Sequence, residues 1–250
     1  MQTNILKQKL AAGQPVTVIA PFASSAGLVE LLGHLGFDGV FLDAEHGPGG
    51  WEEIEHMVRA AEVAGYSSVV RVDRNDAPTI TRALDRGAGG VQIPHVNTAA
   101  EAIAAVEHAK YAPVGHRGWS GWRAAFGEDP GAFAQRANAQ TLVAVMLEEL
   151  EALDNLDEIL CVDHVDVFFV APGDLAQSMG LPGQADHPRV TAAIEDALRR
   201  IRTAGRTSGT LTTPATVDRH LELGVQFLYV GLSSLLAPAA THFVERIQNR

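Results

Sequence analysis

The chain has 250 residues, of which 46% are hydrophobic and 20% are charged. This is enough for one large core, and α/β barrels of this length occur undivided, so we expect residues 1–250 to form a single catalytic domain. The formal net charge of −11 argues against nucleic acid and anionic membranes as partners. The single cysteine, Cys161, excludes an internal disulfide. The sequence shows no recognisable signal peptide and no apolar run long enough to span a membrane. Together with the single cysteine, these features predict a cytoplasmic protein.

Short apolar runs of strand type alternate with amphipathic stretches of helix type. Most runs are continuously apolar, which is typical of parallel strands covered on both faces. The expected strands are Val16–Pro21, Val40–Asp43, Ser68–Val72, Gly90–Pro94, Thr141–Leu147, Val165–Val170, Thr207–Leu211 and Phe227–Val230. The expected helices are Gly27–Leu35, Trp51–Ala64, Pro78–Arg86, Thr98–Lys110, Asn155–Ile159, Pro188–Ala204, Pro214–Leu223 and Pro238–Gln248.

Eight such strand-then-helix units predict an α/β fold, a (β/α)8 TIM barrel. A doubly wound open sheet is the main rival, but Pro21–Gly27, after the first strand, lacks its Gly-rich phosphate fingerprint. The connection between Lys110 and Thr141 is long for a barrel. Its portion Arg117–Trp122 holds two of the three tryptophans. We interpret it as a packing or subunit-contact loop, or else as an ordinary surface excursion.

Polar residues stand where the expected strands end, which in a barrel is the catalytic end. They are Asp43, Glu45, His46, Arg71, Asp73, Gln92, His95, Glu148, Glu149, Asp174, Thr210, Thr212 and Thr213 at the end of the seventh strand, and Ser233 and Ser234 after the eighth. Glu148 and Asp174 follow neighbouring strands, so their carboxylates can converge and repel unless a proton or cation lies between them. An all-oxygen site of this kind suits Mg²⁺ or Mn²⁺. The alternative is that one of them pairs with Arg71 and no metal binds.

Arg71 is the only positive side chain at these strand ends. It can hold a carboxylate or an enolate oxygen, or it can simply balance the local acids. His46 is a candidate general base because an imidazole titrates near neutrality. Asp43, Glu45 or Asp85 are the carboxylates that could orient it.

Gly173 offers a backbone N–H that could approach a substrate carboxylate, unless it only serves a tight turn. We interpret His95 as a packed or hydrogen-bonded histidine. None of the three lysines falls at a predicted strand end, so a Schiff-base mechanism is not expected. A metal then remains as the electron sink.

From about Pro21 to Leu236 the chain resembles the HpcH/HpaI aldolase family, the metal-dependent pyruvate aldolases. Five ordered motifs carry the resemblance, at residues 37–48, 70–72 with 75–76, 83–96, 147–148 with 155–159, and 165–175. Two positions depart from the pattern. Met146 stands where many members have Gln, and Ala171-Pro172-Gly173-Asp174 replaces Gly-Pro-Ala-Asp.

The resemblance implies a divalent metal (Mg²⁺, Mn²⁺ or Co²⁺) on Glu148 and Asp174, with Arg71 on the ketone oxygen of the substrate. It implies that His46 is the base, working with Asp43 or Asp85. It also implies a homo-oligomer, a hexamer built from trimers, in which a neighbour completes the pocket.

The expected reaction is reversible cleavage of a 4-hydroxy-2-oxo acid to pyruvate or hydroxypyruvate and an aldehyde, through an enolate stabilised by the metal and Arg71. The first alternative is a related lyase or decarboxylase acting on oxaloacetate or a CoA thioester through the same enolate. A second is a barrel isomerase that binds phosphate at Gly231–Ser234. A third is a 2-oxo acid binding protein without catalytic activity.

Overall fold

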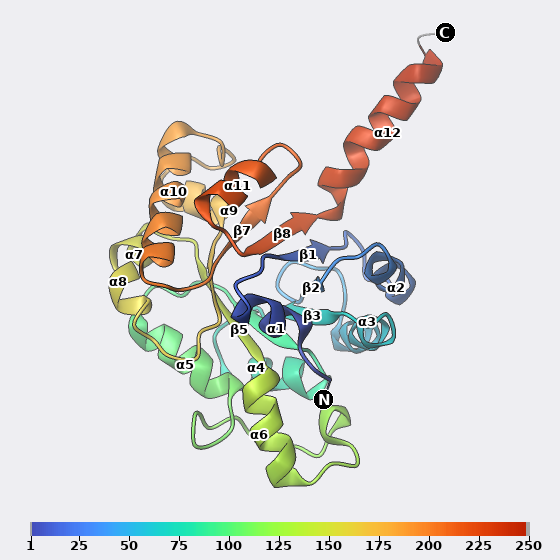
Figure 1. Ribbon diagram of the computed structural model, residues 1–250, viewed down its shortest axis with the longest axis vertical. Coiled ribbons are helices and arrows are strands. Elements are labelled where there is room, and N and C mark those ends of the chain that lie inside the picture. Colours follow the sequence, from blue (N-terminus) through green and yellow to red (C-terminus); the bar gives the residue numbers. More distant parts are fainter. Residues whose placement is uncertain (1, 249–250) are drawn as a thin grey trace.

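The computed structural model describes residues 2–248 and contains a closed barrel of parallel strands in chain order, with β8 pairing back to β1 (Figure 1). The strands are β1 (Val16–Ala20), β2 (Gly39–Asp43), β3 (Ser67–Arg71), β4 (Gly90–Ile93), β5 (Leu142–Leu147), β6 (Val167–Val170), β7 (Ser208–Thr212) and β8 (Phe227–Gly231). The predicted (β/α)8 architecture is confirmed, because every predicted strand is present with its ends shifted by one or two residues at most.

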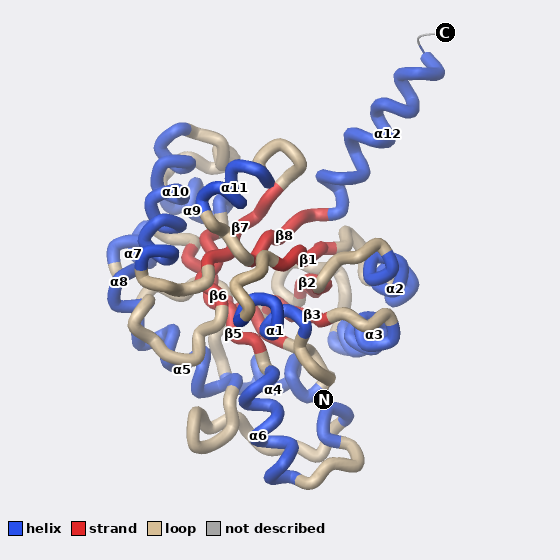
Figure 2. The backbone as a smooth tube through the Cα atoms, in the orientation of Figure 1, coloured by secondary structure: helices blue, strands red, loops and turns tan. Residues whose placement is uncertain are grey.

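The helices surround the strands, as the tube in Figure 2 makes clear. They are α1 (Ile5–Ala11), α2 (Ala26–His34), α3 (Trp51–Val63), α4 (Ala77–Asp85), α5 (Ala99–Ala109), η1 (Arg123–Ala125), α6 (Pro130–Gln140), α7 (Leu150–Asp154), α8 (Leu156–Ile159), α9 (Pro172–Ser178), α10 (Pro188–Thr203), α11 (Val217–Leu223) and α12 (Leu232–Gln248). All predicted helices are found. Four helices, α1, α6, α7 and α9, were not predicted from the sequence, and α6 occupies part of the long connection between Lys110 and Thr141.

The last helix corrects a predicted boundary. We expected it to begin at Pro238, but α12 begins at Leu232 and contains the proline. A proline lacks only its own N–H, so a helix can continue through it at a cost in stability. Ser234 therefore lies in the first turn of α12, where its hydroxyl donates to the Gly231 carbonyl at 2.7 Å.

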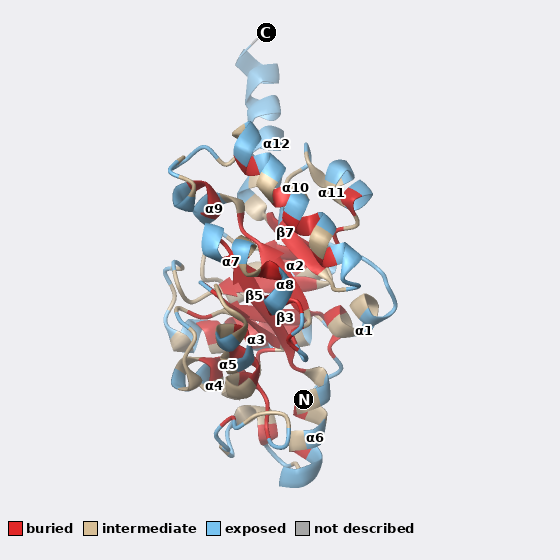
Figure 3. Cartoon of the chain, turned by 90° about the vertical axis from the view of Figure 1, so that its left-hand side faces the viewer, coloured by how far each residue is buried: buried red, intermediate tan, exposed pale blue. Residues whose placement is uncertain are grey.

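Buried residues form two layers, and the colouring in Figure 3 shows that they are concentrated at the centre of the molecule. Inside the barrel, Phe41, Met146 and Phe169 belong to one cluster, and Leu6 of α1 joins it at the end where the strands begin. A larger cluster lies between the strands and the helices. The strands are thus buried on both faces, which explains their continuously apolar sequences.

Local sequence signals mark where several helices begin and end, as expected. Thr98 and Glu101 form a complete capping box at the start of α5. Gly65 and Gly224 follow α3 and α11 with φ values of +76° and +83°, a left-handed conformation that favours glycine and stops a helix.

The helix α12 differs from the others because it projects away from the barrel (Figures 1 and 3). None of its residues is buried. Leu236, Phe243 and Ile247 are 51%, 66% and 62% exposed. Over residues 2–248, no helix is long and apolar enough to cross a membrane.

Candidate active site

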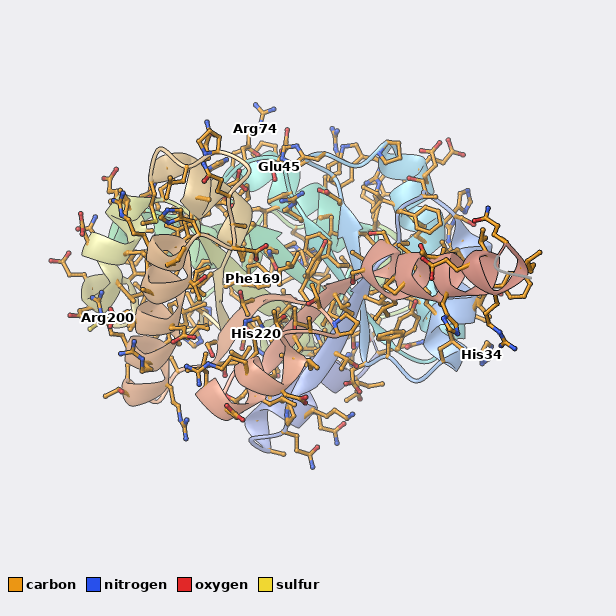
Figure 4. The ribbon with its side chains drawn as sticks, turned by 90° about the horizontal axis from the view of Figure 1, so that it is seen from above. His34, Glu45, Arg74, Phe169, Arg200 and His220 are labelled. Carbon is orange, nitrogen blue, oxygen red and sulfur yellow. The ribbon has the colours of Figure 1, made fainter. Side chains whose placement is uncertain are left out.

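Polar side chains gather at the end of the barrel where the strands finish. Asp43 ends β2 and Arg71 ends β3, and the two are partners in the strand register. Arg71 is in turn paired with Gln92 of β4. Figure 4 shows Glu45, which follows β2, and Arg74, which follows β3, at the same edge of the molecule. Closure of the barrel has therefore collected residues that are far apart in the sequence.

The Arg71 guanidinium holds two carboxylates. Its Nε and Nη2 donate to the two oxygens of Asp43 at 3.0 and 2.6 Å, and its Nη1 lies 3.1 Å from Glu45 Oε2. Burial works to raise the pKa of Asp43, but the hydrogen bonds and charge of Arg71 outweigh it and lower that pKa overall. Among the described residues, the ion-pair partners of Arg71 are thus Asp43 and Glu45, not the predicted metal ligands.

Glu148 follows β5 and is almost fully buried, at 2% exposure. Its Oε1 accepts the backbone N–H of His95 at 2.7 Å. The His95 ring lies between acids, with Nδ1 2.9 Å from Glu149 Oε1 and Nε2 3.8 Å from Glu45 Oε1. Burial lowers the pKa of His95, but the surrounding carboxylates, Glu148 foremost, raise it overall. His95 is also held at a φ of +53°, which is uncommon for a residue with a side chain.

Asp174 lies in the first turn of α9, close enough for its negative charge to act on Glu148. Burial raises the pKa of Glu148, and the negative charge of Asp174 raises it further against the opposing effect of His95. A buried carboxylate beside a like charge is the environment that a cation relieves. In the described part of the chain, no group of three or more His, Cys, Asp or Glu side chains could hold a metal ion. Glu148 and Asp174 together could hold a cation that takes two carboxylates and completes its shell with water or substrate oxygens, as Mg²⁺ does.

The side chain of His46 is 70% exposed, and its Nε2 lies 3.8 Å from Glu45 Oε2. Its connection to Asp43 runs through the backbone, because the His46 N–H donates to Asp43 Oδ1 at 3.2 Å. Of the three carboxylates proposed to orient the imidazole, Glu45 is thus the one that the structure brings to the ring.

Asp85 is not brought to His46 within this chain. It ends α4, which runs from the end of β3 back to the start of β4, so the helix carries Asp85 to the opposite end of the barrel. There it accepts hydrogen bonds from Arg117 at 2.7 Å and from Ser120 at 2.6 Å. The Arg117 guanidinium also lies 4.7 Å from the centroid of the Tyr111 ring. Part of the segment Arg117–Trp122 therefore has a packing role.

A cavity of about 150 Å³ opens at the catalytic end of the barrel. Its polar lining comes from Arg71, Gln92, Asp174 and Tyr229. Its apolar lining comes from Phe41, Met146, Phe169, Ala171, Pro172 and Leu211. Gly173 lies in the same wall, and a Cβ added there would meet no atom within 4 Å, so the backbone at Gly173 is open to an incoming group.

A larger cavity of about 340 Å³ lies at the other end of the barrel, beside Asn4, Ser67, Arg117 and Thr141. Size alone does not identify the functional site. Barrel enzymes place their chemistry where the strands end, and the acids with mutually opposed pKa shifts gather there. We therefore take the smaller cavity as the candidate active site.

Two of these residues carried little weight in the sequence analysis. His95 follows Pro94 and resembles a packed histidine until its contacts with three glutamates are known. Tyr229 was not singled out, because a tyrosine inside the last strand suits an ordinary strand. Its position on an inward face, two residues after Phe227, was the available signal.

The fold and the site together define a (β/α)8 barrel protein with an acidic, arginine-containing pocket at the carboxyl ends of its strands. The chain matches the HpcH/HpaI aldolase/citrate lyase family over residues 21–238 and belongs to that family. It is 36% identical over 239 residues to a hydroxypyruvate/pyruvate aldolase of Pseudomonas aeruginosa, covering 94% of this chain and 89% of the relative.

The chain is also 38% identical over 252 residues to a 4-hydroxy-2-oxo-heptane-1,7-dioate aldolase of Shigella flexneri, covering 98% and 94% of the two proteins. Among solved structures, an HpcH/HpaI aldolase/citrate lyase family protein of Burkholderia cenocepacia J2315 superposes with a TM-score of 0.92 at 31% identity. That match covers 98% of this chain and all of the other. The family predicted from the five motifs is confirmed.

Proposed function

We propose that this protein is a divalent-metal-dependent aldolase. It reversibly cleaves 4-hydroxy-2-oxo acids to pyruvate or hydroxypyruvate and an aldehyde. The observation that carries the proposal is the electrostatic pairing of buried Glu148 with exposed Asp174, whose side chain lines one small cavity together with the Arg71 guanidinium. Relatives named as aldolases of such acids, at 36–38% identity over nearly the whole chain, support it.

Glu148 and Asp174 would hold the cation, with Mg²⁺, Mn²⁺ or Co²⁺ as the candidates. When bound, the metal would supply positive charge beside the carboxylate and ketone oxygens of the 2-oxo acid. The His95 N–H fixes one oxygen of Glu148 at 2.7 Å, which orients the carboxylate toward its ligand. Gly173 has an open backbone position at which a substrate carboxylate can approach.

Arg71 is the residue proposed to bind the ketone oxygen. A guanidinium has five N–H donors, and three of its nitrogens face Asp43 and Glu45. Each terminal nitrogen carries a second hydrogen, so donors remain for the oxygen that becomes negative as a proton leaves carbon 3. Asp43 and Glu45 hold this group rigidly in place, which reduces the reorganisation needed during reaction.

His46 is the proposed base, acting on the carbon 3 proton directly or through a water. Its ring is exposed at the rim and has Glu45 as its acidic neighbour at 3.8 Å. A carboxylate near an imidazole stabilises the protonated form that follows proton removal.

A lyase or decarboxylase acting on oxaloacetate is the second candidate, favoured by the citrate lyase members in the description of the family. It would use the same pocket and the same enolate. The deciding experiment strips the protein of metal and adds back Mg²⁺, Mn²⁺, Co²⁺ or Zn²⁺. Release of pyruvate is then assayed from a panel of 4-hydroxy-2-oxo acids and from oxaloacetate. Metal-dependent release from the aldols supports the aldolase, whereas release from oxaloacetate alone would support the second candidate.

We further propose that the protein is a homo-oligomer, specifically a hexamer that is a dimer of trimers, and that it works in the cytoplasm. The exposed apolar residues of α12 support association with another copy, since a helix without buried residues gains little by staying unpartnered. Replacing Phe243 and Ile247 by glutamate should reduce the mass measured by light scattering. Replacing the exposed Glu245 by glutamine should not, and an unchanged mass in the double variant would exclude α12 from the interface.

A further inference from the structure

Gln92 is an uncharged amide within the lining of the candidate active site. It lies on β4, is 1% exposed, and is the register partner of Arg71 on one side and Ala144 on the other. Its neighbours in the cavity wall include the apolar side chains of Phe41, Met146 and Phe169. A polar group of this kind costs free energy in such surroundings unless it is hydrogen-bonded.

Within residues 2–248, the Oε1 atom of Gln92 has no hydrogen-bond partner, although it is fully buried. The chain thus places an unpaired acceptor in a pocket already proposed to bind a 2-oxo acid. The carboxylate and ketone oxygens of such an acid only accept hydrogen bonds, so pyruvate cannot satisfy this atom. A hydroxyl group both donates and accepts, and it can pair with either end of the carboxamide.

We propose that Gln92 is the residue that selects a 2-oxo acid bearing a hydroxyl group on carbon 3, such as hydroxypyruvate, over pyruvate. This inference rests on the proposed function, because it assumes that the acid binds beside Arg71. Gln92 reaches the same space from the adjacent strand, next to the oxygen-binding guanidinium. A site that hydrogen-bonds a substrate hydroxyl disfavours the analogue without it, because the buried partner is then left unpaired.

Tyr229 is the other uncharged polar side chain in the cavity wall that could contact the hydroxyl. Its ring packs edge-on against Phe41 and Phe169, with centroids 4.8 and 6.0 Å away, so the phenol is held against the apolar residues of the cavity wall. Tyr229→Phe removes its hydroxyl without changing its shape and separates the two contributions.

The test compares hydroxypyruvate with pyruvate on the metal-loaded protein, by calorimetric Kd and by kcat/KM with one common aldehyde. Gln92→Met keeps the length of the side chain and removes its hydrogen bonds, and Gln92→Leu serves if the methionine variant does not fold. Met146→Leu is the matched control, because it changes an apolar wall residue and should affect both acids alike. We expect the native preference for hydroxypyruvate to fall about tenfold or more in the Gln92 variants, the effect of one lost hydrogen bond in a dry site.

An unchanged preference in the Gln92 variants would overturn the proposal. So would an equal fall in Met146→Leu, a fall in Tyr229→Phe alone, or a native protein that does not favour hydroxypyruvate. If Gln92 governs the Kd ratio but neither acid is turned over, this proposal stands and the proposed function fails. If turnover is normal and the ratios do not move, the function stands and this proposal fails.

Discussion

Replacing Arg71 by lysine tests how the site handles negative charge on the substrate. Lysine keeps one positive charge between Asp43 and Glu45 but loses the planar fork that contacts Asp43 at 3.0 and 2.6 Å and Glu45 at 3.1 Å. One ammonium group cannot hold both carboxylates and also face a substrate oxygen. The change should therefore act on catalysis and on folding separately.

The catalytic loss should equal that of one donor to a developing oxyanion, about 2.7–4 kcal/mol, or about 10²–10³ in kcat. The folding loss should be smaller, about 1–3 kcal/mol, because the Arg71 side chain is 14% exposed and water can partly replace the lost charged hydrogen bonds. Arg71→Ala should remove aldol turnover altogether while the metal still binds.

The assay follows pyruvate release by a coupled dehydrogenase, with urea unfolding and metal titration on the same samples. Arg74→Lys is the matched control. Arg74 is the next arginine along the chain, its side chain is 66% exposed, and the side chain of its partner Asp73 is 36% exposed. The Arg74→Lys substitution should change neither aldol turnover nor the midpoint of urea unfolding. Near-native kcat in Arg71→Ala, with metal binding intact, would refute the assignment of Arg71 to the substrate oxygen.

Two further predictions concern buried charges. Glu148→Gln should weaken metal binding at least about 100-fold, because it removes a proposed metal ligand itself and not merely a residue that orients one. The metal-free Glu148→Gln variant should be more stable than the metal-free native protein above about pH 4.5. The pKa of Glu148 is raised in the folded state, so ionisation of this carboxyl group destabilises the native fold as pH rises. Urea unfolding of the metal-free variant at neutral pH checks the sign, and lower stability than native would contradict it. Burial lowers the pKa of Lys110 from 10.5 to about 8, although its Nζ donates to the Asn138 and Thr141 carbonyls. The folded state therefore releases this proton first, and native stability should rise by about 2 kcal/mol between about pH 7.5 and about pH 9.5. Lys110→Met should remove that increment, and an identical pH profile in the variant would argue against the shift.

The local elements of this protein could be read from short stretches of sequence. Continuously apolar runs such as Val40–Asp43 require burial on both faces, and the pattern of Thr98 with Glu101 marks a helix start without reference to the rest of the chain. The helices that escaped prediction are short or polar, as with α9 in the segment after β6. Their helical state depends on packing against neighbours more than on periodicity.

The candidate site was predicted as a set of residue types at strand ends, and that set lies at one end of the barrel. The pairing within the set was not predictable. Glu45 was one of three carboxylates considered for His46, and only the structure brings it near both that ring and Arg71. Asp85 was another, and the course of α4 carries it to the opposite end.

The order of apolar and polar residues determined the barrel, its strands and the end at which its chemistry lies, because burial on two faces imposes that pattern locally. The closed sheet decided which charges meet, since strand register and side-chain direction bring together groups separated by tens of residues. It places the His95 N–H on Glu148 and, among the residues that the structure describes, leaves the amide oxygen of Gln92 unpaired beside Arg71. Those contacts depend on distances across the barrel, which no local stretch of the chain contains.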